Sequence, residues 1–250
     1  QLRKEKVEML KEIYRMLVIN MGIPPKSFEW RYTNEDDSLI IERHTPMSFF
    51  KDVVGMNMSN YVCFCNCPIN EYNKLYQIKL ARGAWDGTDW KYINLEMDKI
   101  KEFAYKALMD TIPVEFSVDM GHEVYSKGGY MFFDVYDYSA IYGIDFKFSK
   151  SIGVLMRESL PNHSMMLVGV DTDVEGGPMK WRIENSWGSD RGEDGFFAMS
   201  DQWFDQYGYS IVINKKYVPE DILKILDTKP VILPGWDPLA RIVSIDGYYD

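Results

Sequence analysis

Two stretches decide the fold of this 250-residue chain: Asn162-His163-Ser164-Met165-Met166-Leu167-Val168-Gly169-Val170 and Lys180-Trp181-Arg182-Ile183-Glu184-Asn185-Ser186-Trp187-Gly188. Both are rich in apolar residues and are typical of two neighbouring strands joined by the polar loop 171–178. Side chains alternate between the faces of a strand, so Asn185 shares a face with Trp181 and Ile183. A buried amide is costly without a hydrogen-bond partner. We therefore expect Asn185 to orient the imidazole of His163 and leave its other ring nitrogen free to work on a thiol.

Each of these residues also has an ordinary structural interpretation. A histidine at the start of an apolar strand is most often a core or edge residue, and an asparagine before a serine most often marks a turn. The joint pattern favours a functional role. An Asn-His pair opens a hydrophobic strand, the Asn-Ser-Trp-Gly stretch follows, and Asp194-Gly195-Phe196-Phe197 comes next.

The two stretches resemble the His and Asn-Ser-Trp-Gly regions of papain-like cysteine peptidases, whose active residues follow the order Cys, His, Asn. The resemblance is closer still to the branch that contains bleomycin hydrolase and bacterial aminopeptidase C. It is carried by residues 21–25, 72–76, 181–188, 195–199, 201–204, 217–220 and 230–238. These stretches span nearly the whole chain and correspond to the C-terminal half of that branch, or somewhat more.

The resemblance implies an α+β, papain-like fold with a C-terminal antiparallel, β-barrel-like domain and a helical insert. It implies that His163 is the catalytic base, that Asn185 orients it and that Trp187 shields their hydrogen bond from water. It also implies a cytoplasmic, homohexameric thiol protease, an aminopeptidase that hydrolyses N-terminal peptide bonds through a thioester. We expect peptide substrates, no cofactor and no metal, and the substrate-binding residues stay unassigned.

The nucleophile of that family has no counterpart here, because no Cys-Trp pair occurs. The three cysteines, Cys63, Cys65 and Cys67, lie within five positions, which disfavours a disulfide framework and favours a reducing compartment. We expect small buried side chains there; a metal site and a surrogate nucleophile are the alternatives. The simplest hypothesis places the catalytic cysteine upstream of Gln1, which makes this chain the C-terminal part of the enzyme.

The rest of the chain divides into three regions: residues 1–160 with the helical insert, 161–215 with His163 and Asn185, and 216–250 with a C-terminal helix and arm. Apolar spacing predicts a helix ending at Gly22, with one buried face formed by Leu10, Ile13, Tyr14, Leu17, Val18 and Met21. Thr45-Pro46 predicts a capped helix start. Further helices are expected over 95–109 and 219–226, and strands over 61–65, 74–80, 113–118, 163–170, 179–185, 195–199 and 209–213.

The composition of the chain disfavours two classes of binding partner, nucleic acids and membranes. With 28 Lys and Arg against 38 Asp and Glu, the formal net charge is −10, which disfavours nucleic-acid binding. No apolar run is long enough for a membrane span. The resemblance implies a terminal carboxylate that captures the substrate's amino group, and Asp246 and Asp250 stand in an apparently longer tail. Two rival functions remain: a non-catalytic papain-fold assembly or binding protein that has lost the nucleophile, and a thiol–metal module built on the three cysteines.

Overall fold

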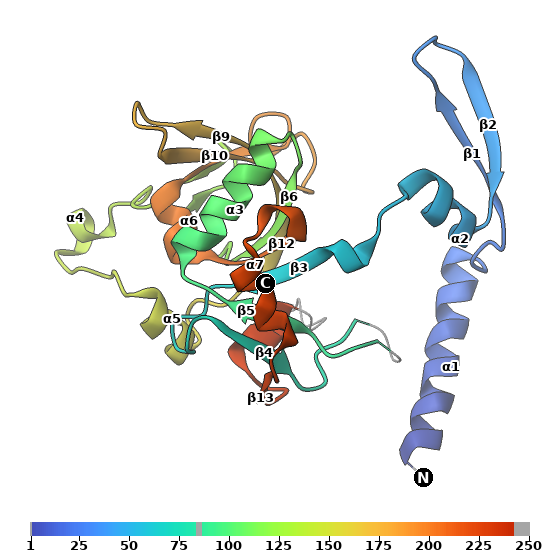
Figure 1. Ribbon diagram of the computed structural model, residues 1–250, viewed down its shortest axis with the longest axis horizontal. Coiled ribbons are helices and arrows are strands. Elements are labelled where there is room, and N and C mark those ends of the chain that lie inside the picture. Colours follow the sequence, from blue (N-terminus) through green and yellow to red (C-terminus); the bar gives the residue numbers. More distant parts are fainter. Residues whose placement is uncertain (1, 84–86, 243–250) are drawn as a thin grey trace. The chain divides into compact units, whose positions relative to one another are not determined.

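The computed structural model describes residues 2–83 and 87–242, in two compact units, Gln1–Met58 and Ser59–Asp250 (Figure 1). The first unit contains α1 (Leu2–Met21), β1 (Phe28–Thr33), β2 (Leu39–His44), α2 (Pro46–Phe49) and a π-helical turn (Phe50–Val54). A 3₁₀ turn, Met58–Asn60, lies at the boundary.

Local signals in the first unit are confirmed. Gly22 adopts a left-handed φ of 82° and its N–H donates to the carbonyl of Val18, which ends α1. Thr45 caps α2 through a reciprocal pair of hydrogen bonds with Ser48, and Pro46 takes the first helical position.

The buried face predicted for α1 is wrong for this unit. Leu10, Ile13, Tyr14 and Leu17 are each about half exposed, and Met21 is 80% exposed. The other regular elements that the structure describes in this unit are the β1–β2 hairpin, the short helix α2 and the π-helical turn, and they leave these side chains exposed. The 3.6-residue period shows that these side chains share a face, but it does not supply a partner for that face.

The second unit is organised around one sheet, which among the described residues has eleven strands in the order β13-β4-β5-β3-β12-β6-β9-β10-β11-β8-β7. The strands are β3 (Tyr61–Cys65), β4 (Lys74–Ile78), β5 (Lys91–Asn94), β6 (Val114–Val118), β7 (Val124–Tyr125), β8 (Tyr130–Met131), β9 (His163–Thr172), β10 (Pro178–Glu184), β11 (Phe196–Ser200), β12 (Gly208–Asn214) and β13 (Val231–Leu233). Most neighbours are antiparallel, and the parallel pairs are β3 with β5, β4 with β13 and β8 with β11. The sheet is thus mixed.

The helices of this unit are α3 (Met97–Met109), α4 (Tyr138–Tyr142), α5 (Lys150–Met156), α6 (Asp201–Tyr207) and α7 (Glu220–Leu223), with 3₁₀ turns at Lys215–Tyr217, Lys224–Asp227 and Pro238–Ile242. α3 contacts β6, β9 and β12 across one face of the sheet (Figure 1). Its predicted inner side is confirmed, since the buried residues include Met97, Ile100, Phe103, Ala104, Ala107 and Leu108.

The core lies between α3, α6 and the inner faces of the central strands. Trp181 and Trp203 are fully buried, as are Phe116 and Phe204, whose rings meet edge to face. Each such side chain contributes about 1.5–3 kcal/mol through burial. This core holds β9 and β10 in place, and they carry the histidine and asparagine.

Predicted and observed elements agree best for β3, β6, β9, β10, β11 and β12. β5 and α6 were not predicted, because each is short and lacks a clear apolar period. Residues 59–160 supply β3 to β8 to the sheet that also contains β9 to β12, so the expected boundary at residue 160 runs through one sheet.

Candidate active site

His163 and Asn185 come together because β9 and β10 are antiparallel neighbours. His163 is the first residue of β9, and Asn185 follows the last residue of β10. The register pairs Glu184 with Met166, which brings the start of one strand beside the end of the other. The register shifts at a β-bulge between Arg182 and Ile183, where Arg182 pairs with Gly169 and Ile183 pairs with Leu167.

The two side chains form a hydrogen bond with a defined direction. His163 Nε2 lies 2.9 Å from Asn185 Oδ1, which also accepts from the backbone N–H of Ser186 at 2.8 Å. Because an amide oxygen only accepts, Nε2 must carry the proton. Nδ1 of His163 is then the nitrogen left to accept or donate a proton elsewhere.

Asn185 is nearly inaccessible, with 9% of its surface exposed. Its Nδ2 has no acceptor within the described residues. A buried amide donor without a partner costs about 1–3 kcal/mol, whereas the two hydrogen bonds to Oδ1 hold the side chain in place.

Trp187 covers the histidine from one side. The indole and imidazole rings stack with centroids 5.0 Å apart and planes 29° from parallel, while Trp187 remains 41% exposed. The indole also meets the ring of Phe197 edge to face. The indole thus lies against one face of the imidazole, as in other aromatic stacks.

The three thiols lie elsewhere in the sheet. Cys63 pairs with Val212 on β12, Val212 pairs with Glu115 on β6, and Glu115 pairs with Met166 on β9. Three strand spacings of about 4.8 Å place Cys63 roughly 14 Å from β9. A thiol that exchanges a proton with His163 must lie within hydrogen-bond reach, so Cys63 is not its partner.

Cys65 and Cys67 are free thiols in an apolar setting. Burial raises the pKa of Cys65 well above its usual range, with the neighbouring Cys63 adding to the effect. Burial also raises the pKa of Cys67 to about 11. Reactive thiols have lowered pKa values, so we expect Cys65 and Cys67 to be poor nucleophiles at neutral pH.

The thiol–metal interpretation finds no ligand set in the described part of the chain, where no three His, Cys, Asp or Glu side chains are grouped to hold an ion. Asp246 and Asp250, considered above for the substrate's amino group, lie outside the described residues.

Comparison with known proteins gives the family. The family model described as "Peptidase C1-like family" matches residues 1–240. The chain belongs to the Peptidase C1-like family. This membership agrees with the resemblance drawn from the His163 and Asn185 regions.

Relatives of this Peptidase C1-like chain are named as peptidases. It is 36% identical to Aminopeptidase C of Lactococcus lactis subsp. cremoris over 239 residues, covering 95% of this chain and 55% of the relative. It is also 36% identical to Bleomycin hydrolase of Rattus norvegicus, covering 94% and 53% respectively. The crystal structure of PepW from Lactobacillus rhamnosis HN001 matches 95% of this chain and 54% of that chain, with a TM-score of 0.90 and 36% identity. The chain therefore spans about half the length of these relatives and shares their papain-like, mixed α/β fold.

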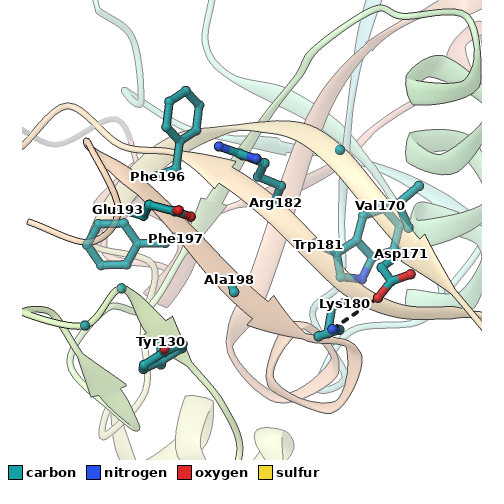
Figure 2. Close-up of a pocket in the computed structure, with 13 residues that line it drawn as sticks. Tyr130, Val170, Asp171, Lys180, Trp181, Arg182, Glu193, Phe196, Phe197 and Ala198 are labelled. Carbon is teal, nitrogen blue, oxygen red and sulfur yellow. Dashed lines mark ion pairs between the residues drawn. The ribbon is translucent and has the colours of Figure 1, made fainter. Parts of the chain in front are cut away.

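A separate pocket of about 660 Å³ lies over β9, β10 and β11 (Figure 2). Arg182 stands over the ring of Phe196 at 4.5 Å, and Lys180 pairs with Asp171 at 3.1 Å. Its lining is Gly128, Gly129, Tyr130, Gly169, Val170, Asp171, Lys180, Trp181, Arg182, Glu193, Phe196, Phe197 and Ala198. None of the candidate site residues is in this lining, so the pocket adds nothing to the chemistry of the histidine.

Beside the site, the sequence pointed to Asn162 only as part of the Asn-His pair, and it did not point to Asp119 or to a contact between them. Asp119 follows β6 directly and Asn162 precedes β9, and their side chains are hydrogen-bonded to each other. The sequence signal that could have identified Asp119 is its position as a polar residue directly after the buried strand β6. It becomes informative only when β6 is known to pair with β9.

Proposed function

We propose that this chain supplies the base and its orienting amide to a cysteine-type aminopeptidase, and that a segment outside the chain supplies the thiol. The supporting observation is the 2.9 Å hydrogen bond between His163 Nε2 and Asn185 Oδ1, which leaves Nδ1 for a thiol. The relatives are nearly twice as long as this chain, which leaves room for such a segment. The chain is then the C-terminal part of the catalytic unit.

In the proposed reaction His163 Nδ1 takes the thiol proton, and the resulting imidazolium stays beside the thiolate. The sulfur attacks the carbonyl carbon of the first peptide bond, forming a C–S bond and moving the electron pair to oxygen. As the C–N bond breaks, Nδ1–H of His163 gives its proton to the leaving amine. Water then attacks the thioester, giving a proton back to Nδ1, and the C–S bond breaks to release the acid.

Asn185 and Trp187 act through His163 in this proposal. The amide oxygen of Asn185 fixes the tautomer and the rotation of the His163 ring, so that Nδ1 faces the thiol in each step. The indole lowers the local access of water and strengthens the hydrogen bond it covers.

The exopeptidase preference rests on relatives named Aminopeptidase C, because no described residue is assigned to the substrate's amino group. A cytoplasmic setting and a homohexamer are part of the same proposal. The free thiols of Cys65 and Cys67 are compatible with a reducing compartment. No helix in the described part of the chain is long and apolar enough to cross a bilayer. Light scattering of the purified full-length protein tests the hexamer.

The decisive experiment treats the full-length protein with a thiol-directed peptidase inhibitor and maps the labelled residue by mass spectrometry. We expect one label outside residues 1–250, cleavage of peptides with a free but not an acetylated amino terminus, and a loss of at least about a hundredfold in kcat for His163→Ala. His44→Ala is the control, since His44 pairs with Glu42 in the first unit. Full activity of His163→Ala overturns the mechanism, and an unlabelled, inactive protein favours the non-catalytic assembly or binding protein.

A further inference from the structure

The backbone of His163 is anchored by residues that the reaction itself does not use. β6 and β9 are antiparallel, and the register places Val118 opposite His163. The pairing continues one residue beyond the start of β9, where the N–H of Asn162 donates to the carbonyl of Val118, the last residue of β6, at 2.9 Å.

Beyond this pair, two side chains tie the strand ends together. Asp119 Oδ1 accepts from Asn162 Nδ2 at 2.8 Å and from the backbone N–H of Gly121 at 2.8 Å. Asn162 Oδ1 accepts in turn from the backbone N–H of Met120 at 2.9 Å. We call these two residues the Asp119–Asn162 clamp.

The clamp is itself held in place. Asp119 is 3% exposed, and its backbone N–H donates to the carbonyl of Tyr207 at 2.9 Å. His122 Nε2 donates to the carbonyl of Glu158 at 3.0 Å and lies 3.5 Å from Asp119 Oδ2. The imidazole of His122 also stacks on Tyr207, with ring centroids 5.4 Å apart. A carboxylate with so many partners has little freedom to move.

We infer that Asp119 and Asn162 are positioning residues for His163, an inference that rests on the proposed function. Asn162 is covalently adjacent to His163, so any movement of Asn162 moves the Cα of His163. The imidazole must meet Asn185 Oδ1 and a thiol at the same time, and a misplacement of about 1 Å can lower a rate about a hundredfold.

The test exchanges the two members of the clamp. Asn162→Asp sets two carboxylates against each other, and we expect kcat to fall about 10- to 100-fold with KM nearly unchanged. In the double variant Asp119→Asn/Asn162→Asp the amide at position 119 donates to the carboxylate at position 162. We expect its kcat to exceed that of Asn162→Asp without reaching wild type, because the hydrogen bond between positions 119 and 162 is restored while the N–H of Gly121 loses its acceptor.

A second readout does not depend on turnover. The imidazole ¹⁵N signals of His163 should report one tautomer in the wild type and in the double variant, and averaged tautomers in Asn162→Asp. Asp173→Ala is the matched control. Asp173 accepts from the backbone N–H groups of Glu175 and Gly177, just past the opposite end of β9.

The outcomes separate the two proposals. An inactive wild type refutes the proposed function, and the ¹⁵N signals of His163 still decide the positioning role. Unchanged kcat and unchanged signals in Asn162→Asp overturn that role, and so does a double variant that stays as impaired as Asn162→Asp. If Asn162→Asp does not fold, Asn162→Ala takes its place in both measurements, with the same expected losses.

Discussion

The indole of Trp187 stacks on the imidazole of His163 at a centroid distance of 5.0 Å, although Trp187 itself is 41% exposed. In the proposed function this indole partly covers the hydrogen bond between His163 and Asn185. Removal of this cover is the first test of the site.

We predict that Trp187→Ala lowers kcat about tenfold in the full-length protein. An aromatic stack contributes about 0.5–1.5 kcal/mol, and about 1.4 kcal/mol corresponds to a factor of ten in rate. Steady-state kinetics on a free-amino-terminus peptide measures the loss. Trp236→Ala is the control, because Trp236 is 75% exposed. Equal effects of the two substitutions contradict a role for the stack.

Asn185→Ala should lower kcat about 10- to 100-fold, because a hydrogen bond to an imidazolium contributes about 1.5–3 kcal/mol. Asn185→Asp keeps an acceptor and should lose less. The comparison is made by stopped-flow acylation kinetics, which isolates the thioester-forming step.

Asn66→Ala serves as a matched control for removal of a buried amide. Asn66 is 4% exposed and donates to the carbonyl of Leu95. It should lower the free energy of unfolding and leave acylation unchanged. A similar loss of acylation in both alanine variants argues against a specific role for Asn185.

We predict that Lys150 makes the free energy of unfolding depend on pH. It is buried, donates to the carbonyl oxygens of Asp205 and Gly208, and lies 4.8 Å from the centre of the Tyr209 ring. Burial lowers the pKa of Lys150 from 10.5 to about 7. Between these values the unfolded chain binds more protons than the folded chain, so the free energy of unfolding rises with pH.

Relative to Lys150→Met, the wild type should gain up to about 1.4 kcal/mol of unfolding free energy per pH unit above pH 7. Urea unfolding between pH 6.5 and 9.5 is the measurement, and Lys79→Met controls for loss of an exposed charge. A constant difference between wild type and Lys150→Met across this range refutes the prediction.

The thiols of Cys65 and Cys67 should resist alkylation in the native protein. A pKa of about 11 for Cys67 leaves a thiolate fraction at pH 8 on the order of a hundredfold below that of an ordinary cysteine. Iodoacetamide labelling followed by peptide mass spectrometry compares native and denatured protein. Fast labelling of either thiol in the native protein contradicts its burial.

Several parts of the fold could be predicted because their signals are local. The inner side of α3 follows from a 3.6-residue period, and the end of α1 follows from Gly22. The strands β9 and β10 are predicted by two apolar stretches of sequence that are joined by a polar loop. α6 and β5 escaped prediction, because seven and four residues are too few for a period to emerge.

Only part of the candidate site could be predicted from the sequence, because only that part has a local signal. His163, Asn185 and Trp187 stand in two stretches whose residue types are informative by themselves, and their family resemblance added the expected roles. The Asp119–Asn162 clamp was missed, because its two members lie 43 residues apart and nothing in the sequence links Asp119 to the Asn-His pair.

The sequence by itself determined which residues alternate, where helices begin and end, and which histidine and asparagine are candidates. These depend on interactions between residues a few positions apart, such as capping bonds and the repeat of a strand or helix. Only the tertiary structure decided that β6 lies between β12 and β9. That placement brings Asp119 to Asn162 and leaves Cys63 three strands from His163. Strand order and register are set by the packing of side chains distant in the chain, which no local pattern encodes.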